Sequence, residues 1–225
     1  MNESPRSRGT RSFVLRQGRM TPAQRRALET LLPARAWPAD GGDPATITGR
    51  YAPLVLEIGT GDGENILAQA VARPHEDFIA CEVHGPGIGH LLLKADQLGL
   101  RNLWVAQRDV HELLDVLPAA SLTEVCLFFP DPWPKTRHHK RRIFQPPLLQ
   151  ALARALARHG RFHVATDIEA YAEWVLEQLA ASADWLNLAG EGRSAPRWRQ
   201  RILTRFEARA RRDGRQVFDF VLALR

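Results

Sequence analysis

The chain has 225 residues, 44% of them hydrophobic, and is long enough for one large domain with a substantial core. Its 31 basic residues outnumber 25 acidic ones, giving a formal net charge of +6 and a pI near 10.1, which favours a polyanionic partner and nucleic acid above all. The sequence has no apolar leader and no run of about 18 apolar residues, which argues against secretion and a membrane span and predicts a soluble, cytoplasmic protein.

Residues 1–50 differ in composition from the rest of the chain. Seven arginines and a single acid, Glu3, fall within the first 26 positions, and a passage rich in proline, glycine and alanine follows. This pattern predicts a basic arm and a linker that are partly flexible. We expect the arm to contribute mainly salt-dependent affinity for a polyanion, because arginines contact phosphates without reading bases.

Residues 51–225 show short apolar runs alternating with longer amphipathic segments. The predicted strands are residues 54–59, 77–83, 103–109, 124–130, 161–166 and 216–224. The predicted helices are residues 64–73, 87–99, 110–117, 147–160 and 168–182. This alternation is typical of an α/β domain in which a mostly parallel sheet is covered by helices.

The first predicted strand runs directly into a glycine-rich loop, "LVLEIGTGDGEN". Gly59 and Gly61 permit left-handed backbone and close approach to a ligand. The loop departs from the nicotinamide fingerprint, which would place its third glycine where this chain has Glu64. Glu57, Asp62 and Glu64 also put negative charge where a pyrophosphate would lie. An uncharged or cationic ligand is favoured, such as S-adenosylmethionine, and a nicotinamide oxidoreductase is disfavoured.

Three acids lie at the ends of successive predicted strands: Glu57, Glu82 and Asp109. The carboxyl ends of parallel strands meet at one edge of a sheet, where ligands bind. Glu82 is placed to accept hydrogen bonds from ribose hydroxyls, and Asp109 lies where an adenine amino group would be. Each acid alone has a simpler explanation, since Asp109 could cap the next helix and Glu57 could pair with a basic residue. Their coincidence favours a shared ligand.

The stretch "FFPDPWPKTRHHKRR" follows the fourth predicted strand. Asp131 stands between two prolines on a stiff backbone, beside Trp133. A carboxylate and an aromatic plane are what a flipped-out base requires, for hydrogen bonding and for stacking. The cations behind them would hold a phosphate backbone; these are Lys135, Arg137, Lys140, Arg141 and Arg142. A proline-stiffened turn followed by a solvated basic face is the simpler alternative.

No metal site is expected. His138 and His139 have no cysteine or carboxylate at ligand spacing. Cys81 and Cys126 both lie inside apolar runs, which predicts buried thiols of a reduced protein.

Six motifs in chain order together resemble the bacterial tRNA (guanine-N7)-methyltransferase family, over nearly the whole chain from Ser12 to about Ala210. They are "SFVLRQGRMT", "LEIGTGDGE", "CEVHGPGIG", "LFFPDPWPKTRHHKRR", "HVATDIEAYAEW" and "LTRFEARA". The resemblance implies a Rossmann-like class I methyltransferase fold over residues 51–225. Its sheet would have seven strands, mostly parallel, with helices on both faces and an antiparallel last strand. It further implies S-adenosylmethionine as cofactor and methylation of a guanine in the variable loop of tRNA, at position 46 in tRNA numbering.

The resemblance also assigns roles to matched positions. Asp131 takes the catalytic position, and the cofactor would be contacted by Glu57, Gly59, Gly61, Glu82, Asp109 and Asp131. The positions matching the family's substrate contacts are Lys135, Asp167, Thr204, Arg205, Phe206 and Glu207. From the residues alone, Asp167 is equally well explained as a helix N-cap, and "TRFE" as the start of an amphipathic helix. Pro134, between Trp133 and Lys135, is a local variation.

The chemistry requires alignment more than acid or base catalysis, because guanine N7 has a free lone pair and no proton to lose. Our hypothesis is that Asp131 orients the guanine and offsets the positive charge that develops on the ring. The alternatives are an amino-methyltransferase acting on DNA, whose motif usually has a second proline where Trp133 stands, and a non-catalytic RNA-binding protein. A monomer and a homodimer are equally compatible with the sequence.

Overall fold

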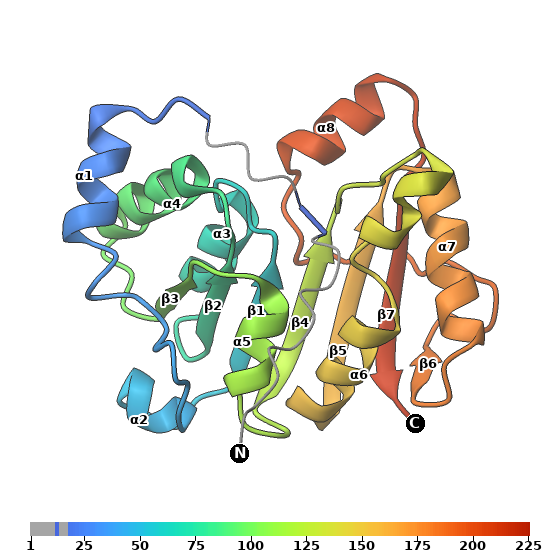
Figure 1. Cartoon of the computed structure of the whole chain (residues 1–225), viewed down its shortest axis with the longest axis horizontal. Coiled ribbons are helices and arrows are strands. Elements are labelled where there is room, and N and C mark those ends of the chain that lie inside the picture. The colour runs from blue at the N-terminus through green and yellow to red at the C-terminus, as the bar shows by residue number, and fades with distance from the viewer. Residues whose placement is uncertain (1–11, 14–17) are drawn as a thin grey trace, which may run out of the picture.

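The computed structural model describes residues 12–13 and 18–225, which form a seven-stranded sheet with helices on both faces (Figure 1). The strands are β1 Leu54–Ile58, β2 Asp77–Cys81, β3 Leu103–Ala106, β4 Leu122–Phe128, β5 Leu156–Thr166, β6 Trp185–Asn187 and β7 Phe218–Leu224. Their order is β3-β2-β1-β4-β5-β7-β6; β1 to β5 are parallel, and β7 is antiparallel to both of its neighbours. The predicted fold is confirmed.

Eight α-helices and one 3-10 helix lie in the described part of the chain. They are α1 Pro22–Thr30, α2 Pro44–Thr48, α3 Glu64–Ala72, α4 Gly85–Gln97, α5 Val110–Val116, η1 Thr136–Arg141, α6 Pro146–Ala155, α7 Glu169–Ala180 and α8 Arg205–Arg212. None of the helices in this described part is long and apolar enough to cross a membrane.

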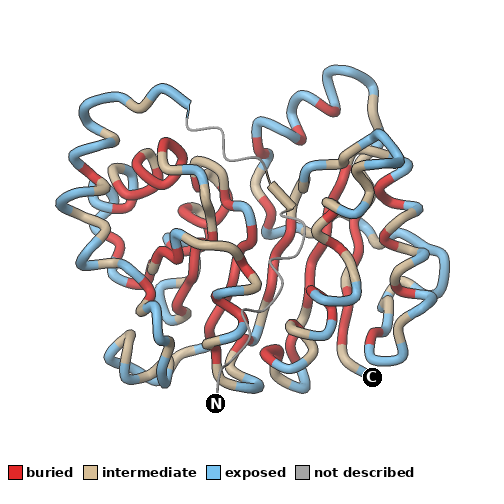
Figure 2. Tube along the Cα trace, viewed as in Figure 1, coloured by how far each residue is buried: buried red, intermediate tan, exposed pale blue. Residues whose placement is uncertain are grey.

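The sheet separates two cores, because alternate side chains of each strand point to opposite faces. Leu54, Leu56 and Ile58 of β1 pack in the cluster that includes α5, α6 and α7. Val55, between them in sequence, packs in the cluster that includes α1, α3 and α4. Buried segments therefore run through the middle of the molecule, with exposed segments around them (Figure 2). Both cysteines are buried thiols, as the sequence predicts.

The helix predicted for residues 147–160 ends earlier than its periodicity suggests. α6 stops at Ala155, and Leu156 takes extended backbone, pairs with Leu122 of β4 and is buried. Pairing at the end of the sheet overrides the helical pattern that the sequence continues to show. β6 was not predicted, because it has only three residues; the buried Trp185 fixes it by donating its indole N–H to the Leu149 carbonyl, at 3.1 Å.

The segment between the basic arm and the α/β domain carries regular structure where the chain is described. α1 begins with a capping box between Thr21 and Gln24 and packs on α4. Farther along, Ala36 bridges to Val105 and so extends the sheet edge beside β3. The division of the chain at residue 50 stays a prediction. Most of the arm's arginines, Arg6, Arg8, Arg11 and Arg16, lie outside the described residues.

Candidate active site

A cleft of about 590 Å³ opens at the carboxyl ends of β1 to β4. It brings together six of the residues predicted from the sequence: Gly59, Gly61, Glu82, Asp109, Asp131 and Phe206. The described Ser12 and Phe13 also line it, so a segment far away in sequence forms part of its wall. Topology explains the convergence of the acids, since parallel strands end at one edge.

Glycines in the loop after β1 and in the helix packed against it are needed for two different reasons. Gly59 and Gly61 have φ values of 71° and 58°, in the left-handed region that side chains disfavour. Gly87, at the start of α4, is needed because the backbone of the loop packs closely against it. A Cβ there would lie 2.3 Å from the Gly61 carbonyl oxygen. The start of α4 therefore packs directly against the loop and fixes one wall of the cleft.

Glu82 is anchored by backbone donors. Its Oε2 accepts from Gly61 N–H at 2.8 Å, and its Oε1 accepts from Val83 N–H at 2.7 Å and His84 N–H at 2.9 Å. One carboxylate thus joins the end of β2 to the glycine loop of β1. This fixes its orientation at the position where the sequence predicts ribose recognition.

Asp109 has the capping role considered from the sequence and also lies on the cleft. It is the N-cap of α5, with its Oδ1 accepting from His111 N–H at 2.9 Å, and it also lines the cleft. The cap holds the carboxylate at the end of β3, so the structural role supports its availability to a ligand.

Glu57 lies in a smaller cavity of about 50 Å³ next to the cleft, with Thr60. Only 6% exposed, it accepts from the Asn65 amide at 2.7 Å, and this partner is not a basic residue. Burial raises the pKa of Glu57 to about 7, although the Asn65 hydrogen bond opposes the shift. The buried Thr60 hydroxyl has no partner among the described residues. A ligand with a protonated amino group and polar atoms beside it would supply both a donor for Glu57 and a partner for Thr60.

The loop after β4 presents Asp131 under backbone strain. Phe129 and Trp133, on either side of it, have φ values of 51° and 44°, which are uncommon for side chains of this size. The Asp131 carboxylate lines the cleft on one side and is open to solvent on the other. Burial on the cleft side raises its pKa above the ordinary value.

Trp133 does not face the cleft as the stacking role predicted from the sequence requires. Its indole N–H donates to the Ser12 carbonyl at 3.0 Å, and the Arg141 guanidinium lies 4.9 Å above its ring. The aromatic surface of the cleft comes instead from Phe129 and Phe206, whose rings stack with centroids 6.2 Å apart. Phe206 is 59% exposed, so its ring is accessible.

The basic run forms the 3-10 helix η1, and its cations do not all point outward. Lys135, Arg137 and Lys140 are exposed, and Arg141 is half-buried over Trp133. Arg142 is 4% exposed. The sequence-based prediction that all five cations hold phosphate is therefore wrong for Arg142, because its side chain is packed inside the protein.

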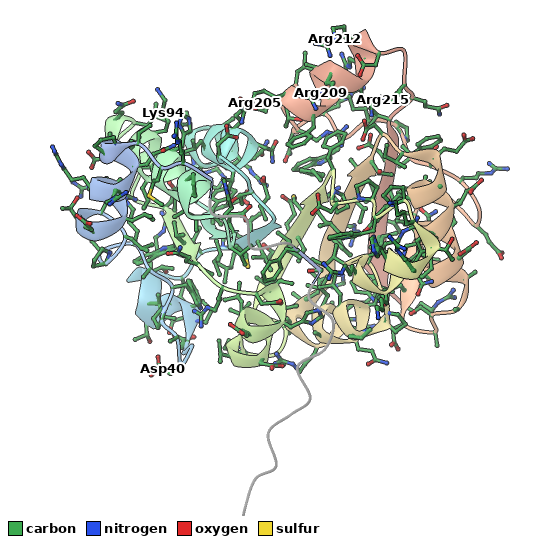
Figure 3. All side chains as sticks on the ribbon, turned by 45° about the horizontal axis from the view of Figure 1, so that its top comes forward. Asp40, Lys94, Arg205, Arg209, Arg212 and Arg215 are labelled. Atoms are coloured by element: carbon green, nitrogen blue, oxygen red, sulfur yellow. The ribbon has the colours of Figure 1, made fainter. Side chains whose placement is uncertain are left out.

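Arg205 connects α8 to the glycine loop. It forms ion pairs with Asp62 and Glu64, the latter with 3.4 Å between Nε and Oε1, and its backbone N–H donates to Glu64 at 3.2 Å. The preceding Thr204 caps α8 by accepting from Glu207 N–H at 3.2 Å. In Figure 3, Arg205 and Arg209 lie along α8, with Arg205 toward the loop. Arg205 of α8 therefore offsets part of the negative charge of the glycine loop.

Glu207 is buried in an ion-pair network and does not line the cleft. It pairs with Arg197 at 2.6 Å, Arg201 at 3.1 Å and Arg211 at 2.5 Å, and Arg201 also pairs with Asp219 of β7. Burial alone would raise the pKa of Glu207, but the hydrogen bond from Arg197 and the charge of Arg201 lower it to about 2. No local sequence signal distinguished Arg197, Arg201 or Asp219 from other charged residues.

Asp167 and Lys135 lie outside the cleft. Asp167 pairs with Arg215, while the N-cap of α7 is Ile168, so the capping explanation for Asp167 is wrong. Lys135 is exposed at the start of η1. Within the part of the chain that the structure describes, no group of three or more His, Cys, Asp or Glu residues is placed to hold a metal ion.

Comparison with known proteins identifies close relatives in sequence. A family model described as a putative methyltransferase matches residues 51–220. The tRNA (guanine-N(7)-)-methyltransferase of Halorhodospira halophila is 48% identical, over 97% of this chain and 96% of its own. The protein of the same name from Methylococcus capsulatus is also 48% identical, over 98% of this chain and 96% of its own.

Solved structures with the same fold are distant in sequence. A 16S rRNA methyltransferase is 18% identical, with a TM-score of 0.53 over 79% of this chain and 89% of its own. A 16S rRNA (adenine(1408)-N(1))-methyltransferase from Catenulisporales acidiphilia is also 18% identical, with a TM-score of 0.54 over 80% of this chain and 87% of its own. At this identity the likeness establishes the fold alone.

Proposed function

The chain belongs to the tRNA (guanine-N(7)-)-methyltransferase family, and from that premise we propose how its cleft carries out methyl transfer. The enzyme methylates guanine N7 in tRNA with S-adenosylmethionine as donor. The observation that carries the proposed site is the convergence of Glu82, Asp109 and Asp131 on one cleft, beside an exposed cationic surface. We place the acceptor guanine in the variable loop, at position 46 in tRNA numbering, and the enzyme in the cytoplasm, where tRNA is used.

The cleft and the cavity beside it fit S-adenosylmethionine through the chemistry of their side chains. Glu82 and Asp109 are hydrogen-bond acceptors for ribose hydroxyls and an adenine amino group. The glycine loop offers close backbone approach at Gly59 and Gly61. Glu57, protonated in part near neutral pH, and the Thr60 hydroxyl, which has no partner among the residues that the structure describes, suit the amino acid end of the donor. When bound, the donor supplies a methyl group activated by a sulfonium.

Asp131 acts on the acceptor base. Its carboxylate accepts hydrogen bonds from the guanine N1 and amino hydrogens and so orients N7 toward the methyl carbon. With the donor bound, the N7 lone pair would form the new N–C bond as the C–S bond of the donor broke, with the electrons of that bond remaining on sulfur. The guanine ring becomes positively charged, and the Asp131 carboxylate offsets that charge. No proton leaves N7, so Asp131 need not act as a base.

The substrate-side residues divide into those that contact tRNA and those that hold the contacts in place. Lys135 and the exposed cations of η1 bind phosphates on one side of the cleft, and the exposed Arg205, Arg209 and Arg212 of α8 do so on the other (Figure 3). The last three are spaced to lie on one helical face. Phe206 stacks on a base. The remaining predicted substrate residues act through neighbours: Thr204 by capping α8, Glu207 by holding Arg197 and Arg201, and Asp167 by holding Arg215.

The test is methyl transfer from labelled S-adenosylmethionine to two unmodified tRNA transcripts, with guanine or adenine at position 46. We expect label only on the guanine transcript, mapped to that base by cleavage at 7-methylguanosine. Label on another nucleotide would refute the variable-loop assignment while leaving the enzyme class intact.

The role of Asp131 is tested in the same assay at saturating substrates. Asp131→Asn is expected to lower kcat by about 100-fold, the effect of losing one group that stabilises developing charge. Burial raises the pKa of Asp131, so this carboxylate takes up its proton at a higher pH than an ordinary carboxylate does. As the pH is lowered, the wild-type rate is therefore expected to begin to fall at that higher pH. Near-full turnover by Asp131→Asn would refute this role.

A further inference from the structure

Arg142 differs from the other cations of the basic run, because its side chain points into the protein. It is 4% exposed, whereas Arg137 and Lys140 are exposed. A charged side chain is rarely this buried unless its surroundings hold it there. Arg142 cannot contact a tRNA phosphate without leaving its site.

The guanidinium of Arg142 joins the loop that carries Asp131 to the start of α7. Its Nε donates to the Pro132 carbonyl oxygen at 3.0 Å, and its Nη1 donates to the Ala170 carbonyl oxygen at 3.3 Å. Pro132 directly follows Asp131. The hydrogen bond therefore fixes the backbone one residue away from the carboxylate that faces the cleft.

Two aromatic rings of α7 enclose this guanidinium. Its central carbon lies 5.5 Å from the Tyr171 ring centroid and 5.1 Å from that of Trp174, within the range of cation–π attraction. Trp174 is itself held, since its indole N–H donates to the Phe144 carbonyl at 2.7 Å. The arginine thus rests against a rigid helix, not against the loop alone.

No carboxylate among the described residues forms an ion pair with Arg142. Burying a charge without a carboxylate partner is costly, so a stability role would be met more readily by an apolar side chain of similar size. What only a guanidinium supplies here is a planar set of donors that bonds two carbonyl groups while stacking on aromatic rings.

We propose that Arg142 is a positioning residue for methyl transfer, which sets the position of the Asp131 carboxylate by holding the Pro132 carbonyl against α7. The inference rests on the proposed role of Asp131. A displacement of about 1 Å at a reacting group can cost about 100-fold in rate, so loosening this anchor lowers kcat while tRNA affinity is retained.

The experiment compares Arg142→Lys and Arg142→Ala with wild type in the full-length chain, using S-adenosylmethionine and an unmodified tRNA transcript. Both variants are expected to lower kcat by at least about tenfold, with KM for tRNA, cofactor affinity and the salt dependence of binding within about twofold. Arg158→Ala is the matched control, because this exposed arginine lies in the part of β5 far from the cleft. It is expected to change none of these quantities.

A phosphate contact would behave differently. Lys140→Ala, which removes an exposed cation of η1, is expected to raise KM for tRNA and lower the salt slope by about one. The same pattern for Arg142→Lys, with kcat unchanged, would overturn the proposal. Wild-type kinetics in a folded Arg142→Lys protein would also overturn the proposal. The lysine variant therefore keeps the test decisive if the alanine variant does not fold.

Chemical rescue separates positioning from simple loss of packing. A cavity of about 370 Å³, lined by Arg142 with Pro132 and Trp174, lies between the loop and α7. Millimolar guanidinium chloride is expected to enter it and raise kcat of Arg142→Ala at least about threefold, with no gain for Arg158→Ala. Absence of rescue in a folded protein would count against the proposal.

A double-mutant cycle distinguishes failure of this inference from failure of the proposed Asp131 role. If Arg142 acts through Asp131, Arg142→Lys slows Asp131→Asn by less than about twofold. Full additivity would refute the coupling although Asp131 itself matters. Wild-type turnover by Asp131→Asn alone would instead refute the catalytic role on which the inference rests.

Discussion

The two sides of the cleft are built in different ways. On the proposed cofactor side, Glu82 directly follows β2 and Asp109 lies in the short loop after β3. Both are held by backbone N–H groups within three residues or in the neighbouring loop. On the proposed tRNA side, the groups lie on η1 and α8. Buried side chains join these elements to other segments: Arg142 donates to the Ala170 carbonyl of α7, and Glu207 pairs with Arg197 in the segment before α8. A site for a fixed small molecule can be built from regular strand ends. A surface for a large polyanion needs cations on projecting helices, which must then be braced.

The largest expected effect is a loss of cofactor affinity when Glu82 can no longer accept all of its backbone hydrogen bonds. Glu82→Gln is expected to weaken S-adenosylmethionine binding by about 100-fold, or about 2.7 kcal/mol, because an amide cannot accept at both positions from three N–H donors and from a ribose. Isothermal titration calorimetry measures this, with the exposed Glu29→Gln on α1 as control. A change below about threefold would mean that the glycine loop is held without Glu82.

The second prediction concerns proton release at Glu57. With a pKa near 7 in the free protein, Glu57 is about half protonated at pH 7, and a cationic amino group would ionise it. Cofactor binding at pH 7 should therefore release about half a proton, seen as a binding enthalpy that differs between Tris and phosphate buffers. Glu57→Gln should abolish the difference. A wild-type enthalpy independent of buffer would show that Glu57 does not meet the amino group.

The raised pKa of Glu57 also predicts how the stability of the protein changes with pH. Folded protein binds the Glu57 proton more tightly than unfolded protein, so the free energy of unfolding falls as pH rises from about 4.5 to about 7. The contribution is at most about 3 kcal/mol, and Glu57→Gln should remove it from the pH profile of urea denaturation.

The smallest expected effect lies where the two sides meet. Arg205→Ala removes the exposed ion pairs to Asp62 and Glu64, and pairs of this kind contribute up to about 1 kcal/mol. Cofactor affinity should fall by about threefold to fivefold, because the glycine loop is no longer held against α8, and the fall should be larger at low salt than at high salt. Arg209→Ala on the same helix should weaken tRNA binding without this change in cofactor affinity. Equal cofactor affinity in both variants would mean that the two sides are not coupled.

The sequence by itself determined the edge of the sheet at which the proposed cofactor residues lie. Apolar runs alternating with amphipathic segments specify a mostly parallel sheet, and any residue at the end of such a strand must lie at the common edge. Glu82, Asp109 and Asp131 were therefore placeable from their position in the chain. The resemblance to a known family added the tRNA-side positions, including Arg205 and Phe206, which spacing alone did not single out.

Only the tertiary structure decided which way the charged side chains of the tRNA side point. Arg142 and Lys140 are neighbours of similar charge in one basic run, yet one is enclosed by α7 and the other is exposed. Glu207 likewise turned out to be buried among arginines from another segment. Local pattern fixes the identity and spacing of such residues. Their direction depends on packing between elements distant in the chain, because a buried charge is tolerated only where the assembled fold supplies its partners.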